Sequence, residues 1–198
     1  MYVENLLYAE DIIYYKKRRL LLYKLRFMSF EQLNLDPRIL KALKDIGFEK
    51  PTDIQAKSIP IAMEGKDIIG ESMTGSGKTA AFAIPIVQKM EPKKGVQSLI
   101  LAPTRELAMQ ISQEFEKFAK YMGLHVAIVY GGVSIVPQID RIRHSEIVVG
   151  TPGRLVDHLT RRTLDLSGLK IMVLDETDRM LDMGFIDDIR KIFSKVPN

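Results

Sequence analysis

The chain has 198 residues, of which 46% are hydrophobic, and it contains no cysteine. This length suits one well-buried domain with room for a tail, and the lack of cysteine excludes both a disulfide framework and a thiolate metal site. The net charge of +4 comes mainly from the first 28 residues, so it is not a nucleic-acid signature of the whole chain. No apolar stretch is long enough to span a bilayer and no signal peptide opens the chain, which predicts an intracellular, cytoplasmic protein.

Residues 1–28 form a basic N-terminal extension that differs in kind from the rest. It is rich in Tyr and Leu, with Tyr14-Tyr15-Lys16-Lys17-Arg18-Arg19 at its centre. The codon for Met28 could itself be the start codon. Three interpretations stay open. The extension is an ordered helix that packs on the domain or on another chain, a disordered or upstream-translated leader, or a basic arm that grips RNA or an anionic membrane.

Two helices are predicted next. Asp36 and Pro37 are a favoured N-cap and first-turn pair, and Gly47 ends the helix that they begin. Thr52 opens a second helix that runs to Ala62. The first helix carries apolar residues at helical spacing, namely Ile39, Leu40, Leu43 and Ile46.

Short apolar runs then alternate with helical segments, among them 106–118 and 154–159. Runs that are apolar on both faces, with helices between them, indicate a parallel sheet covered by helices on both faces, which is an α/β fold. The five runs are Ile68–Gly70, Ser98–Ala102, Val126–Tyr130, Ile147–Gly150 and Ile171–Leu174.

A glycine-rich turn over residues 72–79 follows the first run and is typical of a phosphate-binding loop. Gly75 and Gly77 let the backbone curl so that successive N–H groups face a phosphate. Lys78 supplies a charge near the β- and γ-phosphates, and Thr79 places a hydroxyl where Mg²⁺ would bind. Ser72 stands where the strict motif has Gly.

The last apolar run leads directly into Asp175 and Glu176. An Asp at the carboxyl end of a buried strand can hold the water shell of a metal ion, and the adjacent Glu can orient or deprotonate an attacking water. Either feature alone is common. Together, the loop and the acidic pair predict a site for ATP and Mg²⁺.

Ligands of such folds gather at the carboxyl ends of the strands. Arg105 and Arg154 both lie in the opening turn of a helix, where a cation is unfavourable unless an anion binds. Free helix N–H groups with a guanidinium can hold a phosphate, and Gly131-Gly132 lets a backbone pass close by. The alternative is that each arginine only pairs with a neighbour such as Glu106 or Asp157.

Gln55 also has two interpretations. Thr52 and Gln55 have the spacing of a capping box, in which they satisfy donors at the helix end. A side-chain amide can equally pair with the edge of adenine, and the two roles do not exclude each other.

These segments together resemble the ordered motif set of the DEAD-box RNA helicases, from Phe30 to the C-terminus, and specifically the first RecA-like domain, a P-loop NTPase, over residues 29–198. The motifs are Phe30, residues 47–55 (GFEKPTDIQ), residues 74–79 (TGSGKT), residues 103–108 (PTRELA), Gly131-Gly132, residues 151–154 (TPGR) and residues 175–178 (DETD).

The resemblance implies roles for individual residues. Phe30 would stack near adenine, Thr52 and Gln55 would read the adenine edge, and Glu176 would act on the water. The nucleotide set is Phe30, Lys50, Thr52, Gln55, Thr74, Gly75, Ser76, Gly77, Lys78 and Thr79, with Lys78 and Asp175 joining Glu176 in catalysis and Thr79 and Asp175 at Mg²⁺. One RNA strand would be held by Pro103, Thr104, Arg105, Gly131, Gly132, Thr151, Pro152, Gly153 and Arg154.

The chain departs from the family pattern in three ways. Thr177 replaces the usual Ala, so its hydroxyl needs a partner if it is buried, and Ser72 replaces another Ala. The sequence stops at Asn198, before the family's third motif and its second RecA-like domain. We therefore expect a truncated half-site that binds nucleotide weakly and hardly hydrolyses it, since arginine fingers are missing. Two rival functions are a helicase or translocase acting on DNA and a non-catalytic nucleotide- or RNA-binding module.

Overall fold

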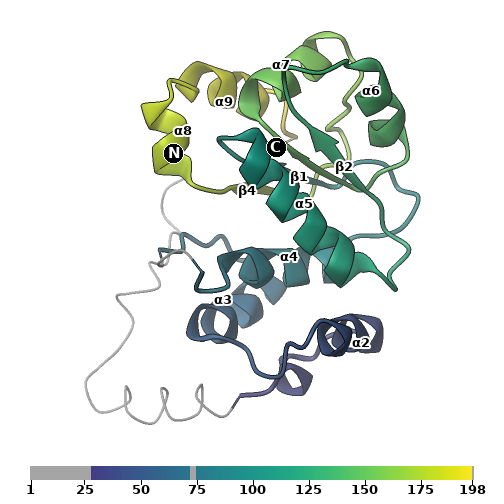
Figure 1. Cartoon of the computed structure of the whole chain (residues 1–198), viewed down its shortest axis with the longest axis vertical. Coiled ribbons are helices and arrows are strands. Elements are labelled where there is room, and N and C mark those ends of the chain that lie inside the picture. The colour runs from purple at the N-terminus through teal and green to yellow at the C-terminus, as the bar shows by residue number, and fades with distance from the viewer. Residues whose placement is uncertain (1–27, 72–74, 198) are drawn as a thin grey trace. The chain divides into compact units, whose positions relative to one another are not determined.

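The computed structural model describes residues 28–71 and 75–197 (Figure 1). The chain divides into two compact units, the first ending at Gln88 and the second beginning at Lys89. Each unit is described by itself. The basic extension falls on residues 1–28 and, apart from Met28, lies outside the described residues, so its three interpretations stay open.

The first unit is built from helices, as the capping signals predict. Asp36 accepts a hydrogen bond from the backbone N–H of Arg38 and so caps the helix that begins at Pro37. Gln88 ties this region to the last helix of the unit, because its side chain accepts from the N–H of Asp36 and donates to the carbonyl of Asn34. The elements are the 3₁₀ helix η1 (Phe30–Leu33) and the α-helices α2 (Pro37–Asp45), α3 (Asp53–Met63) and α4 (Lys78–Lys89).

The second unit contains a four-stranded, fully parallel sheet in the order β2-β3-β1-β4. The strands are β1 (Ser98–Leu101), β2 (Val126–Val129), β3 (Ile147–Gly150) and β4 (Ile171–Leu174). All residues of β1 and β3, the two central strands, are buried, as expected for a sheet covered on both faces. Four of the five predicted strands are thereby confirmed.

The predicted strand at Ile68–Gly70 is wrong. Only Ile69 forms an isolated β-bridge, and its side chain is 46% exposed. Ile68 is half-buried and Gly70 is exposed, so the run lacks the buried apolar face that would stabilise a hydrogen-bonded ladder.

Five helices accompany the sheet. The connection from β1 to β2 passes over β3 in one direction along the sheet. The connections from β2 to β3 and from β3 to β4 run in the opposite direction. Because parallel crossovers are right-handed, α5 lies on one face of the sheet and α6 and α7 lie on the opposite face. Figure 1 shows α5 in front of the strands. The helices are α5 (Arg105–Ala119), α6 (Val136–Arg143), α7 (Pro152–Thr160), α8 (Thr177–Asp182) and α9 (Ile186–Phe193).

The core of the second unit joins the strands to α7 and α9 through a cluster of buried apolar residues that includes Leu99, Val148, Leu155, Met180 and Ile192. This confirms the α/β class predicted from the sequence, a parallel sheet flanked by helices. None of the helices in the described part of the chain is both long and apolar enough to cross a membrane.

Candidate functional site

The described part of the phosphate loop has the backbone that its glycines permit. Gly75 and Gly77 have φ angles of 80° and 91°, in the left-handed region that side chains disfavour. Lys78 and Thr79 open α4, and the N–H of Ala81 donates to the carbonyl of Gly77 at 3.1 Å. A glycine turn that runs into a helix N-terminus is a favourable geometry for an anion. The predicted residue Thr74, like Ser72, lies outside the described residues.

Gln55 links the start of α3 to this loop. Its Oε1 accepts from the N–H of Thr52 at 3.0 Å, which completes the predicted capping box, and its Nε2 donates to the carbonyl of Gly77 at 3.1 Å. The residue is only 2% exposed. A Cβ on Gly77 would overlap Nε2 of Gln55, so the close approach requires glycine there. The capping role is therefore confirmed, and the same amide also holds the phosphate loop.

The other predicted adenine-side residues lie in the same unit. Phe30 is 3% exposed, and its ring packs against that of Phe48 with the centroids 6.2 Å apart. Phe30 is therefore a core residue of the first unit. Lys50 lies on the exposed segment between α2 and α3.

The acidic pair lies at the carboxyl end of β4. The N–H of Asp175 donates to Leu101 of the neighbouring strand at 3.0 Å, so the ladder extends one residue beyond the strand. Glu176 then adopts a left-handed conformation, with φ 50° and ψ 53°, as the residue before α8. A non-glycine residue in this region is strained, a condition that clusters at functional sites. The carboxylate of Glu176 accepts from Arg179 at 3.1 Å.

Thr177 causes no burial problem. The residue is exposed, and its hydroxyl donates to the carbonyl of Leu174 at 3.3 Å. The extra hydroxyl therefore has a partner, and the departure from the family's Ala is tolerated locally.

The three predicted nucleic-acid segments do meet at one edge of the sheet. The N–H of Thr151 donates to Val129 and that of Ala102 donates to Gly150, which aligns the carboxyl ends of β2, β3 and β1. Thr104 caps α5 by accepting from the N–H of Leu107 at 3.2 Å. Pro103 immediately precedes this cap, and Thr151, Pro152 and Gly153 begin α7.

Contacts of the two arginines join these segments to the loop after β2. The guanidinium of Arg105 lies 4.6 Å from the ring centroid of Tyr130, a cation–π geometry. Arg154 donates through Nη2 to the carbonyl of Val133 at 2.9 Å, and its side chain is 12% exposed. Asp157 is 3.9 Å from Arg154 and pairs more closely, at 2.6 Å, with Arg161. Arg154 therefore makes the predicted ion pair with Asp157, at the long distance of 3.9 Å, in addition to its hydrogen bond to Val133.

Sequence reasoning did not foresee the parts played by Tyr130, Gln138 and His158. No motif marks Tyr130 as the partner of Arg105, and His158 would be interpreted as an ordinary position on the polar side of a short helix. In the structure, His158 is completely buried and Gln138 is 5% exposed. Buried polar side chains on two elements near one loop are the signal that only the folded chain reveals.

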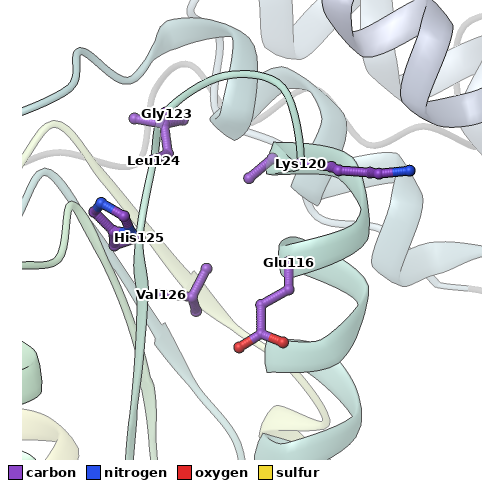
Figure 2. A pocket seen from close by; sticks show the side chains of 7 residues that line it. Glu116, Lys120, Gly123, Leu124, His125 and Val126 are labelled. Carbon is purple, nitrogen blue, oxygen red and sulfur yellow. The ribbon is translucent and has the colours of Figure 1, made fainter.

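A hollow on the second unit lies away from this edge. Figure 2 shows Glu116 and Lys120 of α5 on one side, and Gly123 to Val126, which lead into β2, on the other. No predicted site residue lines it, and it lies at the amino end of β2, opposite the edge where the predicted segments meet.

Within residues 28–71 and 75–197, no three His, Asp or Glu side chains gather as a metal site. Mg²⁺ commonly keeps several waters and takes one or two protein oxygens together with substrate phosphates, so it does not require such a cluster.

Comparison with known proteins places the chain in a family. The model of the DEAD/DEAH box helicase family matches residues 52–198, and the chain belongs to that family. It is 47% identical over 172 residues to a probable ATP-dependent RNA helicase of Methanocaldococcus jannaschii, covering 86% of this chain and 47% of that protein. The chain thus spans about half the length of this relative.

Solved structures agree on the fold. The crystal structure of a DEAD box protein from the hyperthermophile Methanococcus jannaschii is similar, with a TM-score of 0.84 and 47% identity, covering 86% of this chain and 47% of that one. A hypothetical ATP-dependent RNA helicase from Sulfolobus tokodaii gives a TM-score of 0.75 and 43% identity, covering 81% and 47% of the two chains.

Proposed function

We propose that this chain binds ATP with Mg²⁺ and the sugar-phosphate backbone of one RNA strand, as the ATP-binding half of an ATP-dependent RNA helicase. The observation that carries this proposal is family membership over residues 52–198, a range that contains the phosphate loop, the acidic pair and the nucleic-acid edge. The name of the relative from Methanocaldococcus jannaschii supports RNA as the substrate.

In this proposal, the first unit contributes the nucleotide contacts. Backbone N–H groups of the phosphate loop and the charge of Lys78 bind the β- and γ-phosphates. Gln55 holds the loop through Gly77 and, with Thr52, reads the adenine edge through the N–H and the lone pair that its two backbone bonds leave. Phe30 and Lys50 flank the adenine side.

The acidic pair contributes the catalytic groups. Asp175 and Thr79 would hold Mg²⁺, which neutralises phosphate charge when bound. Glu176 orients the attacking water and accepts its proton, while Lys78 stabilises charge on the phosphates. Glu176 must exchange its contact with Arg179 for that water, and an exposed ion pair of this kind costs little to break.

The nucleic-acid edge holds RNA by its backbone. Helix N-termini at α5 and α7, the glycines of the loop after β2, and the side chains of Arg105 and Arg154 offer donors to phosphates. Such contacts carry no base information. The whole protein would add a second RecA-like domain with arginine fingers, close on ATP and RNA, bend one strand out of a duplex and reopen after hydrolysis. Its place of work is the cytoplasm.

The catalytic proposal is tested by Glu176→Gln in a two-domain form of the protein. The RNA-stimulated ATPase rate should fall by about 10²–10⁴ while ATP and RNA affinities stay near the parental values, because the metal keeps Asp175 and only the base is lost. Glu64→Gln is the control, since Glu64 makes an exposed ion pair with Lys66 and lies outside the predicted site. Turnover at near the parental rate would remove Glu176 from the mechanism.

The same assay separates the rival functions. Stimulation of the parental ATPase by DNA rather than RNA would favour a DNA helicase or translocase. A parental protein that binds ATP but hydrolyses none with either nucleic acid would be a binding module.

The RNA edge is tested by Arg105→Ala and Arg154→Ala. Each should weaken binding to all RNA sequences alike and lower the slope of log affinity against log salt by about 0.7, the value for one phosphate contact on a single strand. A loss confined to one sequence, or an unchanged slope, would mean that these arginines make no phosphate contact.

A further inference from the structure

A buried glutamine closes the loop after β2. This glycine loop, residues 130–134, begins at Tyr130 and contains Gly131 and Gly132. Nε2 of Gln138, in the first turn of α6, donates to the carbonyl of Tyr130 at 3.1 Å and to that of Ser134 at 3.3 Å. One side chain thus bridges the two ends of the loop.

His158 of α7 sets the orientation of that glutamine. Its Nε2 lies 3.4 Å from Oε1 of Gln138, and its Nδ1 lies 2.8 Å from the hydroxyl of Thr163. Both amide hydrogens of Gln138 go to carbonyls, so its Oε1 accepts an N–H from Nε2 of His158. Nδ1 of the neutral ring then accepts from the hydroxyl of Thr163, which also lies 3.2 Å from the carbonyl of His158. Burial, with the charge of Arg154 adding to it, lowers the pKa of His158, which favours the neutral ring.

Three carbonyls of the glycine loop accept hydrogen bonds from side chains of the protein. Those of Tyr130 and Ser134 accept from Gln138, and that of Val133 accepts from Arg154. Within the part of the chain that the structure describes, the N–H groups of Gly131, Gly132 and Val133 have no hydrogen-bond partner, and these residues are exposed. Gly132 adopts φ 81° to make this arrangement. The loop presents donors outward, as an anion requires.

We propose that Gln138, oriented by His158, is a positioning residue that fixes the glycine loop with its N–H groups directed at the RNA backbone. The role rests on the proposed function of this edge. Gln138 touches no nucleic acid itself and acts through the loop. The glutamine and histidine couple the loop after β2 to the helix that carries Thr151 to Arg154, so that two of the three RNA-binding segments are held as one body.

The test compares Gln138→Ala with a matched control, Gln97→Ala. Gln97 is also buried, at 1% exposed, and its amide also makes two backbone bonds, both to Glu91, before the amino end of β1. Both changes should destabilise the protein to a similar degree. Only Gln138→Ala should lower the NMR order parameters of the Gly131 and Gly132 amides, from near 0.85 toward 0.6.

Affinity for single-stranded RNA is measured on the same proteins. Gln138→Ala should weaken it about tenfold, the factor expected when the competent loop conformation falls to about a tenth of the population. The salt slope should stay parental, because Gln138 is neutral and makes no phosphate contact, in contrast to Arg105→Ala. His158→Phe should act like Gln138→Ala. His158→Gln, which can present an N–H near the position of Nε2, should restore most of the affinity.

Three outcomes would overturn the inference: unchanged order parameters in Gln138→Ala, an equal RNA loss in Gln97→Ala, or lowered order with undiminished RNA affinity. A different result would refute the proposed function. If the parental protein binds no RNA at any concentration tested, RNA binding is excluded, while the order parameters still show whether Gln138 holds the loop.

Discussion

Two buried glutamines, one in each unit, hold glycine-containing loops in the same chemical way. Gln55 donates to the carbonyl of Gly77 in the phosphate loop, and Gln138 donates to the carbonyls at both ends of the glycine loop. They differ in what orients them. The N–H of Thr52, three residues away on the same helix, fixes Gln55, whereas His158, twenty residues along the chain and on another helix, fixes Gln138.

The orientation of Gln55 thus depends on a local contact, and that of Gln138 depends on a tertiary contact. A capping box forms as soon as its helix forms, because both partners belong to one turn. The contact between Gln138 and His158 exists only after α6 and α7 have packed on the sheet. Damage to the first glutamine should therefore have consequences close to α3 and the phosphate loop, and damage to the second should depend on the packing of the whole second unit.

The largest effect is expected from Gly77→Ala, which attacks the local arrangement. The new Cβ must occupy a left-handed backbone conformation and would also overlap Nε2 of Gln55. We expect a loss of about 2–4 kcal/mol in the free energy of unfolding, measured by urea denaturation, and a large loss of ATP affinity. Gly75→Ala is the control, because its φ of 80° imposes similar strain, while none of the described residues has an atom within 4 Å of the position of the new Cβ. Equal losses in the two variants would mean that Gln55 does not constrain the loop.

Next in size is Gln55→Ala. It leaves the N–H of Thr52 and the carbonyl of Gly77 without their partner, so the free energy of unfolding should fall by about 1–3 kcal/mol. Affinities for ATP and GTP, measured by calorimetry, should both fall because the phosphate loop loses its contact with Gln55. The affinity for ATP should fall further because the adenine contact is also lost. An equal loss for both nucleotides would leave Gln55 with its capping and loop-holding roles alone.

The tertiary arrangement predicts a pH effect at His158. Burial lowers the pKa of His158 in the folded protein, so the unfolded chain takes up this proton at a higher pH. The contribution of the neutral His158 ring to the free energy of unfolding is therefore fully present above about pH 6.5. It declines as the pH falls toward the lowered native pKa, by at most about 1.4 kcal/mol for each pH unit. Urea denaturation between pH 7.5 and 5 should show a shallower decline in His158→Gln. The same slope in both proteins would contradict a buried neutral imidazole.

The smallest effect belongs to a purely local contact, the cap of α2. Hydrogen bonds from Arg38 lower the pKa of Asp36 to about 2, so this contribution is present above about pH 3.8 and is lost as the pH falls through 2. Asp36→Ala should cost about 1 kcal/mol at pH 7, and Asp36→Asn, which keeps a capping oxygen, should cost less. A pH dependence of unfolding between 4 and 2 that is unchanged in Asp36→Asn would rule out this carboxylate as its source.

Much of the fold could be predicted because its signals are local. The helix predicted to begin after Asp36 begins at Pro37, the one predicted from Thr52 to Ala62 spans Asp53–Met63, and four apolar runs are strands within one residue of the predicted bounds. The strand predicted at Ile68–Gly70 is wrong because apolar character alone does not supply a neighbouring strand or a buried face.

The sequence by itself determined the motifs, the caps and the expectation that segments following parallel strands would share an edge, since that expectation needs only the parallel α/β class. The strand order β2-β3-β1-β4 was decided by the tertiary structure, and with it the contacts of Arg105 with Tyr130, of Arg154 with Val133 and of His158 with Gln138. Each of these joins residues twenty or more positions apart. No spacing rule reaches that far, because the distance between such residues is set by how the strands and helices pack and not by the path of the chain between them.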